Sequence, residues 1–176
     1  MELFWTKGYH NLGVDEICRE TGMTKGAFYN SFKSKELFLL TTIEHYGSFI
    51  TEHLKKQLTN SKLQAFDRLL SVYREMLEAQ TKNNHIGCFV NNTMSELGTL
   101  NTSIAATASD QFQKFLNIIE PTVKEAQQNQ DLTDTIDSKL LTEIIHTTFF
   151  GVLTTSKSIK TSGYATMETF LYSLKK

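Results

Sequence analysis

Side chains that can bind nucleic acid gather between residues 24 and 35 of the sequence. Thr24 and Tyr29 carry hydroxyl groups that can donate hydrogen bonds to phosphate oxygens. Lys25 can reach a phosphate or the edge of a guanine, and the amide of Asn30 can pair with adenine. The cluster comprises Thr24, Lys25, Gly26, Ala27, Tyr29, Asn30 and Lys35. This chemistry suits contact with double-stranded DNA.

Catalytic and metal-binding chemistry has weaker support in the sequence. Cys88 and His85 offer a nucleophile and a base. No third residue that would orient the base is evident, and free cysteine is among the most buried residue types. His45 and His53 lie about two helical turns apart, which is too far to bind one metal ion without other ligands. We therefore predict no catalytic residue, no metal site and no cofactor, and a cysteine-based enzyme is an unfavoured alternative.

The composition is typical of a helical globular protein. The chain has 176 residues, 40% of them hydrophobic, with one proline and nine glycines. No alternating pattern is long enough to predict a strand, and no apolar run approaches the roughly 18 residues of a membrane helix. The first residues do not form a signal peptide. We expect a cytoplasmic protein with no membrane partner, two free thiols, and a local basic face despite a net charge of −1.

Two short helices position the candidate DNA-binding residues. The first is predicted over Val14–Thr21 and ends at Gly22, and the second is capped by Thr24 and runs through Phe32. Two such helices joined by a glycine turn form a helix-turn-helix, whose second helix enters the major groove. The alternative interpretation of this pattern is an ordinary set of short helices with a solvated lysine face.

Helical periodicity continues to the end of the chain. Ser34 caps a long helix, the capping-box pattern Ser61-Lys62-Leu63-Gln64 opens another, and Asp137 caps a third. We predict an all-α fold of about nine helical segments. Its three-helix DNA-binding head occupies residues 1–46, and its helical effector-binding and dimerisation body occupies residues 47–176.

Three blocks of the N-terminal sequence resemble the DNA-binding signature of the TetR family in residue type and spacing. They are Leu3-Phe4-Trp5-Thr6-Lys7-Gly8-Tyr9, then Val14-Asp15-Glu16-Ile17, then Gly22-Met23-Thr24-Lys25-Gly26-Ala27-Phe28-Tyr29-Asn30-Ser31-Phe32-Lys33-Ser34-Lys35-Glu36-Leu37. The resemblance covers residues 3–40 almost continuously. A weaker likeness to the ligand-binding portion of some members lies in Gly87-Cys88-Phe89, Asn92 and Glu96-Leu97.

The resemblance implies a homodimeric repressor whose body binds a small molecule and thereby releases a DNA operator. The positions that match DNA-facing residues of the family are Thr24, Lys25, Gly26, Tyr29, Asn30 and Lys35. The sequence departs from the family pattern at three places. Leu12 stands where a phosphate-binding threonine is usual, so we expect one backbone contact to be absent. Ser31 replaces a frequent histidine, and Cys18 replaces a small alanine.

Aromatic residues recur at helical spacing through the body, and most of them must fill its core. Ligand pockets are usually apolar with a few polar groups, so we expect a mostly apolar effector. The predicted lining residues are Tyr73, Phe89, Asn92, Thr93, Phe112, Phe115, His146 and Phe149. The last two helices carry more apolar surface than a monomer requires, which predicts a four-helix dimer interface. The predicted interface residues are Leu141, Ile145, Phe149, Val152, Met167 and Leu171.

Two further expectations concern the start of the chain and the competing class of function. Met1 aligns with the interior of the family's first helix, so we expect residues upstream of it in the native protein. The competing class is a helical small-molecule-binding or scaffold protein without DNA binding. Operator binding with a steep salt dependence would discriminate between the two classes.

Overall fold

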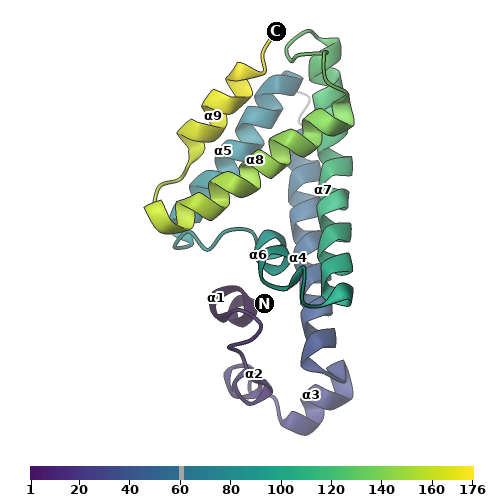
Figure 1. Cartoon of the computed structure of the whole chain (residues 1–176), viewed down its shortest axis with the longest axis vertical. Coiled ribbons are helices and arrows are strands. Elements are labelled where there is room, and N and C mark those ends of the chain that lie inside the picture. Colours follow the sequence, from purple (N-terminus) through teal and green to yellow (C-terminus); the bar gives the residue numbers. More distant parts are fainter. Residues whose placement is uncertain (60–61) are drawn as a thin grey trace. The chain divides into compact units, whose positions relative to one another are not determined.

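Start and stop signals along the sequence divide the chain into helices. The computed structural model describes residues 1–59 and 62–176, and within them it contains nine α-helices and no β-strand (Figure 1). The helices are α1 (Glu2–Lys7), α2 (Val14–Thr21), α3 (Lys25–Phe32), α4 (Lys35–Leu58), α5 (Ala65–Lys82), α6 (Phe89–Leu97), α7 (Thr102–Gln128), α8 (Ser138–Ile159) and α9 (Tyr164–Ser173). The predicted all-α fold is confirmed.

Glycine and capping side chains set several helix ends where the sequence predicts them. Gly22 ends α2 in the left-handed conformation, with φ 69° and ψ 14°. The Thr24 hydroxyl accepts a hydrogen bond from the Ala27 amide at 3.1 Å and caps α3. Asp137 accepts from the Lys139 amide at 3.0 Å and caps α8. Each cap satisfies amide groups that the first turn of a helix leaves without partners.

The start of α5 is later than the sequence predicts. The helix begins at Ala65, and Gln64 is in the N-cap position with an extended backbone. Ser61, the first residue of the predicted capping box, lies outside the described residues. Neither Cys18 nor Cys88 forms a disulfide, and both side chains are buried. Among the described residues, no helix is long and apolar enough to cross a membrane.

The chain divides into two compact units, each assembled from two separate stretches. The first unit comprises Met1–Ser48 and Phe89–Phe112, and the second comprises Phe49–Cys88 and Gln113–Lys176. Helices α4 and α7 therefore contribute residues to both units. The predicted domain boundary near residue 46 lies close to the first break. That α6 and the start of α7 join the N-terminal unit is not anticipated by the sequence, and the functional assignment of the two domains stays a prediction.

The first unit has an aromatic core around the helix-turn-helix. Phe28 of α3 is completely buried, and its ring lies 5.4 Å from that of Phe38 in α4. Phe4 of α1 reaches the same cluster, with its ring 5.6 Å from Phe38. Ile17 of α2 is also completely buried. These contacts fix α3 with its inward face on the core and its opposite face in solvent.

The second unit is formed largely by α5, α8 and α9, with parts of α4 and α7 (Figure 1). Helix α9 packs against both α5 and α8. Leu69 and Tyr73 of α5, Ile145 of α8, and Met167 and Leu171 of α9 are completely buried. The core of this unit therefore lies between these three helices.

Candidate DNA-binding and effector sites

The exposed face of α3 carries most of the predicted DNA-binding residues. Six of the seven lie together at the α3 N-cap and along α3, and all six are exposed: Thr24, Lys25, Gly26, Ala27, Tyr29 and Asn30. Phe28 points the other way into the core. Helical geometry thus separates a polar, donor-rich face from an apolar one, as a recognition helix requires.

Lys25 is held by an acidic neighbour on α2. Its Nζ lies 2.7 Å from Oδ1 of Asp15, and both side chains are well exposed to solvent. The hydrogen bond and the charge of Asp15 raise the pKa of Lys25 above its ordinary value. An exposed pair of this kind is weak, because both ions stay hydrated. A phosphate group can therefore compete with Asp15 for the ammonium.

Lys35, the seventh predicted DNA-binding residue, makes its hydrogen bonds to the backbone of its own chain. Its Nζ donates to the carbonyl oxygens of Tyr9 at 2.9 Å and of Leu12 at 3.0 Å. The ammonium also lies 4.1 Å from the centre of the Tyr9 ring. Two of its three hydrogens are thus bound to the turn between α1 and α2. Lys35 fixes that turn, and its contact with DNA stays a prediction.

Leu12, one of the three departures from the family pattern, has a side chain that is completely buried. An apolar residue here therefore packs in the core of the first unit. Its carbonyl, rather than its side chain, makes the polar contact of this position, since it accepts from Lys35.

Glu96 of α6, which enters the sequence predictions only through the weaker likeness to the ligand-binding portion of the family, makes polar contacts in the first unit. Its carboxylate accepts hydrogen bonds from the Tyr9 amide at 2.9 and 3.2 Å and from the His10 amide at 3.3 Å. The partners are separated by 87 and 86 positions in the sequence. No local pattern marks such a pair, so only the fold reveals it.

A buried polar pair lies among aromatic rings in the second unit. Tyr73 Oη is 3.2 Å from His146 Nδ1, and both side chains are buried. The ring of His146 lies 5.4 Å from Phe149 and 6.0 Å from Phe115. Desolvation lowers the pKa of His146 to about 3 and raises the pKa of the Tyr73 hydroxyl. The pair is therefore uncharged at neutral pH.

The eight predicted pocket residues are divided between the two units. Tyr73, Phe115, His146 and Phe149 come together in the second unit, as described above. The other four belong to the first unit: Phe89, Asn92, Thr93 and Phe112. Phe89 packs against Trp5 and Tyr46 with ring separations of 6.0 and 5.8 Å, so it contributes to the core of that unit.

The six predicted dimer residues are all buried within the single chain: Leu141, Ile145, Phe149, Val152, Met167 and Leu171. They face inward because α8 and α9 pack on each other and α9 on α5. Little of these side chains is exposed on the single chain, and their role in a dimer stays a prediction. The outward positions of the same two helices are the ones available to a partner.

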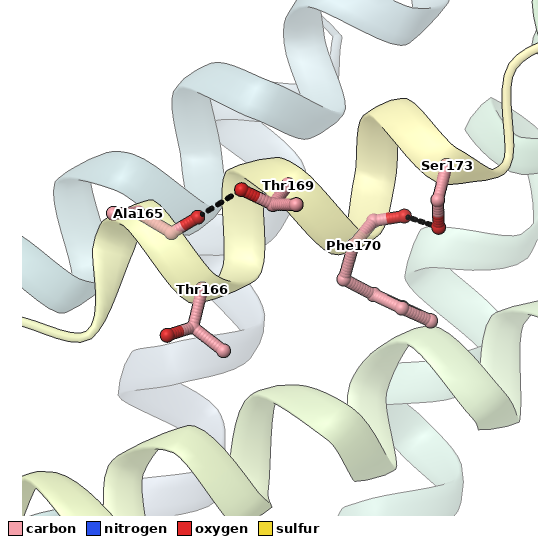
Figure 2. A pocket seen from close by; sticks show the side chains of 5 residues that line it. All are labelled: Ala165, Thr166, Thr169, Phe170 and Ser173. Carbon is pink, nitrogen blue, oxygen red and sulfur yellow. Dashed lines mark hydrogen bonds between the residues drawn. The ribbon is translucent and has the colours of Figure 1, made fainter.

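The outward face of α9 bears uncharged side chains, four small and one aromatic, around an open hollow. It is lined by Ala165, Thr166, Thr169, Phe170 and Ser173 (Figure 2). The Thr169 hydroxyl donates to the Ala165 carbonyl at 2.8 Å, and the Ser173 hydroxyl donates to the Phe170 carbonyl at 2.6 Å. These hydroxyl groups are satisfied by their own helix, which lowers the cost of covering the face with a partner.

Family models match most of the chain. A model described as bacterial regulatory proteins of the tetR family matches residues 1–41, and a model of the tetracyclin repressor-like C-terminal domain matches residues 65–167. The second match alone covers more than half of the chain. Together they span the helix-turn-helix and most of the second unit.

Individual relatives agree with the family models. The chain is 27% identical over 158 residues to the transcriptional regulator AcuR of Cereibacter sphaeroides, covering 89% of this chain and 72% of that protein. The crystal structure of a regulatory protein TetR from Rhodobacter sphaeroides has a TM-score of 0.90 at 25% identity, covering 98% of this chain and 92% of that one.

A second similar structure is that of the regulator FadR from Bacillus subtilis, in complex with stearoyl-CoA. Its TM-score is 0.81 at 22% identity, and the alignment covers 98% of this chain and 92% of that one. The fold, the exposed recognition helix and both family matches lead to one conclusion. The chain belongs to the TetR family of DNA-binding transcriptional regulators.

Proposed function

We propose that the chain acts as a homodimeric repressor that binds an operator through α3 and releases it when its helical body binds a mostly apolar small molecule. The observation that carries the proposal is the exposed donor face of α3 behind the Gly22 turn and the Thr24 cap. A regulator of this kind acts on the chromosome in the cytoplasm and catalyses no reaction.

On this proposal, phosphate contacts orient α3 and base contacts give sequence preference. Thr24 accepts from the Ala27 amide and keeps its own hydroxyl hydrogen for a phosphate oxygen. The exposed hydroxyl of Tyr29 provides a second phosphate donor. Lys25 and Asn30, both exposed, would contact base edges. Two heads of a dimer would then read half-sites about 34–36 Å apart along the duplex.

The effector class follows from the chemistry around Tyr73 and His146. An uncharged hydrogen-bonding pair among phenylalanine rings favours a mostly apolar compound with a hydrogen-bonding group, because a charged group would lose its hydration there. The structure of FadR with stearoyl-CoA supports effector binding in a body of this fold. An effector acts only to the extent that it prefers the conformation with low operator affinity.

The dimer on this proposal uses the outward faces of α8 and α9. On α9 this face is the hollow lined by Thr166, Thr169 and Phe170, among others. On α8 it includes the exposed positions Thr147 and Gly151. Small uncharged residues let helices approach closely without burying charge.

Selection from a random pool of DNA duplexes tests the proposal directly. The purified chain should enrich one sequence with two related half-sites, and its affinity for that sequence should fall steeply with salt. A library of small molecules is then screened for a rise in melting temperature and for release of the selected duplex. No enrichment would contradict operator binding, and release only by highly charged compounds would contradict the effector class.

A further inference from the structure

The turn between α1 and α2, residues 8–13, is held from two sides by opposite charges. Lys35 donates to the carbonyls of Tyr9 and Leu12, and Glu96 accepts from the amides of Tyr9 and His10. We infer that Glu96 is a positioning residue for DNA binding, which holds this turn, and through it α2 and α3, in the conformation that reads the operator. The inference rests on the proposed function.

The carboxylate lies directly against the backbone of the turn. Gly8 has φ +76°, and a Cβ built there would lie 3.0 Å from Oε1 and 3.1 Å from Oε2 of Glu96. The Tyr9 amide meets both oxygens, at 2.9 and 3.2 Å. Hydrogen bonds to an ionised acceptor are about twice as strong as neutral ones. Loss of the carboxylate would leave the two amides without this acceptor.

Helix α6 holds Glu96 firmly, because its opposite end is packed among aromatic rings. Phe89, the first residue of α6, lies near Trp5 of α1 and Tyr46 of α4, and those two rings are 5.1 Å apart in an edge-on arrangement. Leu97, next to Glu96, is also buried. The helix therefore contacts α1 at its start and the α1–α2 turn at its end.

The turn is connected to the recognition helix by short segments. It leads directly into α2, which begins at Val14, and α2 packs against α3. The turn thus directly precedes the helix-turn-helix. A change in the conformation of the turn is transmitted to α2 through a single peptide bond. Hydrogen bonds to both its amides and its carbonyls restrict the conformation of the turn more than either set of bonds alone.

The Glu96 carboxylate would affect operator affinity in two opposite ways, and substitutions can separate them. Its negative charge disfavours phosphate, whereas its acceptor oxygens order the turn. Glu96→Gln removes the charge and keeps one acceptor oxygen at the position of Oε1, which receives both amides. Glu96→Ala removes both. If ordering dominates, only Glu96→Ala should weaken operator binding; if repulsion dominates, both substitutions should strengthen it.

The experiment uses the full chain and the duplex selected from the random pool. Hydrogen exchange of the amides of Tyr9 and His10 and the Kd for the duplex are measured for wild type, Glu96→Ala and Glu96→Gln. Ser95→Ala is the matched control, because Ser95 is exposed and its hydroxyl donates to the Asn91 carbonyl of its own helix. Glu96→Ala should accelerate exchange at the two amides and raise Kd, each by about tenfold. Glu96→Gln should stay within about threefold of wild type.

The possible outcomes separate the inference from the function on which it rests. Wild-type operator affinity in Glu96→Ala would overturn the inference alone, as would tighter binding by both variants. Unchanged exchange at Tyr9 and His10 in Glu96→Ala would also overturn it, because the contact would then not order the turn. Failure of the wild-type chain to select any duplex would overturn the proposed function. Exchange within α5 should be unchanged in every variant, and its acceleration by Glu96→Ala would show general unfolding and reject the local role.

Discussion

At the scale of single residues, the ion pair between Lys25 and Asp15 makes DNA affinity depend on two charges of opposite effect. Lys25→Ala should weaken operator binding and reduce the slope of log affinity against log salt by about one, if the ammonium neutralises one phosphate. Asp15→Asn should strengthen binding, because the competing anion is removed. Filter binding or fluorescence anisotropy over a range of salt concentrations measures both effects.

Lys139→Ala, at the exposed start of α8, is the control for the loss of one positive charge far from α3 in the sequence. It should keep the wild-type affinity and salt slope. Equal behaviour of Lys25→Ala and Lys139→Ala would contradict the assignment of α3 as the recognition helix.

His146 makes the free energy of unfolding depend on pH. The pKa of His146 is lowered to about 3 by burial, whereas an unfolded histidine titrates near 6.5. Below pH 6.5 the unfolded chain therefore binds a proton that the folded chain excludes, and stability falls as the pH falls. Between pH 6.5 and 4.5 this single group should cost about 2–3 kcal/mol. Urea unfolding at these two pH values measures the change in the free energy of unfolding.

Comparison of that pH dependence between variants isolates His146 from the carboxylates, which titrate in the same range. His146→Gln should show a smaller loss of stability between the two pH values, whatever its stability at neutral pH. His45→Gln, which replaces an exposed histidine, should behave as the wild type. A wild-type pH dependence in His146→Gln would show that this residue is not the cause.

Residues whose partners are close in the sequence are easier to predict than residues whose partners are distant. The α3 face was predictable because a cap, a glycine turn and a local run of donors lie within a dozen positions. Glu96 was not, since its role depends on a partner more than 80 positions earlier. The buried dimer candidates on α8 illustrate the same limit, because a broad apolar stripe does not tell which part of it meets the chain's own helices.

At the scale of elements, α4 and α7 approach so closely at Gly47 that no larger side chain fits without movement. A Cβ at Gly47 would lie 2.0 Å from Oε1 and 2.6 Å from Cδ of Gln111, whose side chain is buried. Gly47→Ala should lower the free energy of unfolding by about 1–3 kcal/mol despite the better helix propensity of alanine. Chemical denaturation measures the change.

Two further variants check the cause. Adding Gln111→Ala to Gly47→Ala should restore part of the lost stability, because the overlapping atoms are removed. Gly26→Ala in α3 adds a methyl group that lies 3.9 Å from Thr24 Oγ1, an ordinary contact distance. It should raise the free energy of unfolding by up to about 1 kcal/mol. A stabilising effect of Gly47→Ala would show that Gln111 moves aside freely.

Helix ends and helix contacts differ in how far the sequence predicts them. Gly22, Thr24 and Asp137 set the ends of α2, α3 and α8 through bonds that span a few residues, and periodicity alone predicts those helices. The contact of α6 with the N-terminal helices depends on ring packing between Trp5 and Phe89, which no local pattern specifies.

At the scale of the whole molecule, we predict that two chains form a dimer through the outward faces of α8 and α9. The wild-type chain should sediment as a dimer at micromolar concentration. Thr166→Lys, in the hollow on α9, should shift the equilibrium toward monomer, because pairing would bury an uncompensated charge near the symmetry-related copy. Ala106→Lys, at an exposed position of α7, is the control and should stay dimeric. A monomeric wild type would reject the dimer.

The first unit is also discontinuous in the chain, which has a consequence for its biosynthesis. Its N-terminal stretch ends at Ser48, and its remaining residues extend to Phe112. At a translation rate of about 5–20 residues per second, roughly 2 to 10 seconds separate the synthesis of Ser48 from that of Leu97, the last residue of α6. During that interval the nascent helix-turn-helix has neither Phe89 to cover Trp5 nor Glu96 to hold its entry turn. The growing polypeptide therefore completes its DNA-reading surface only after α6 has left the exit tunnel.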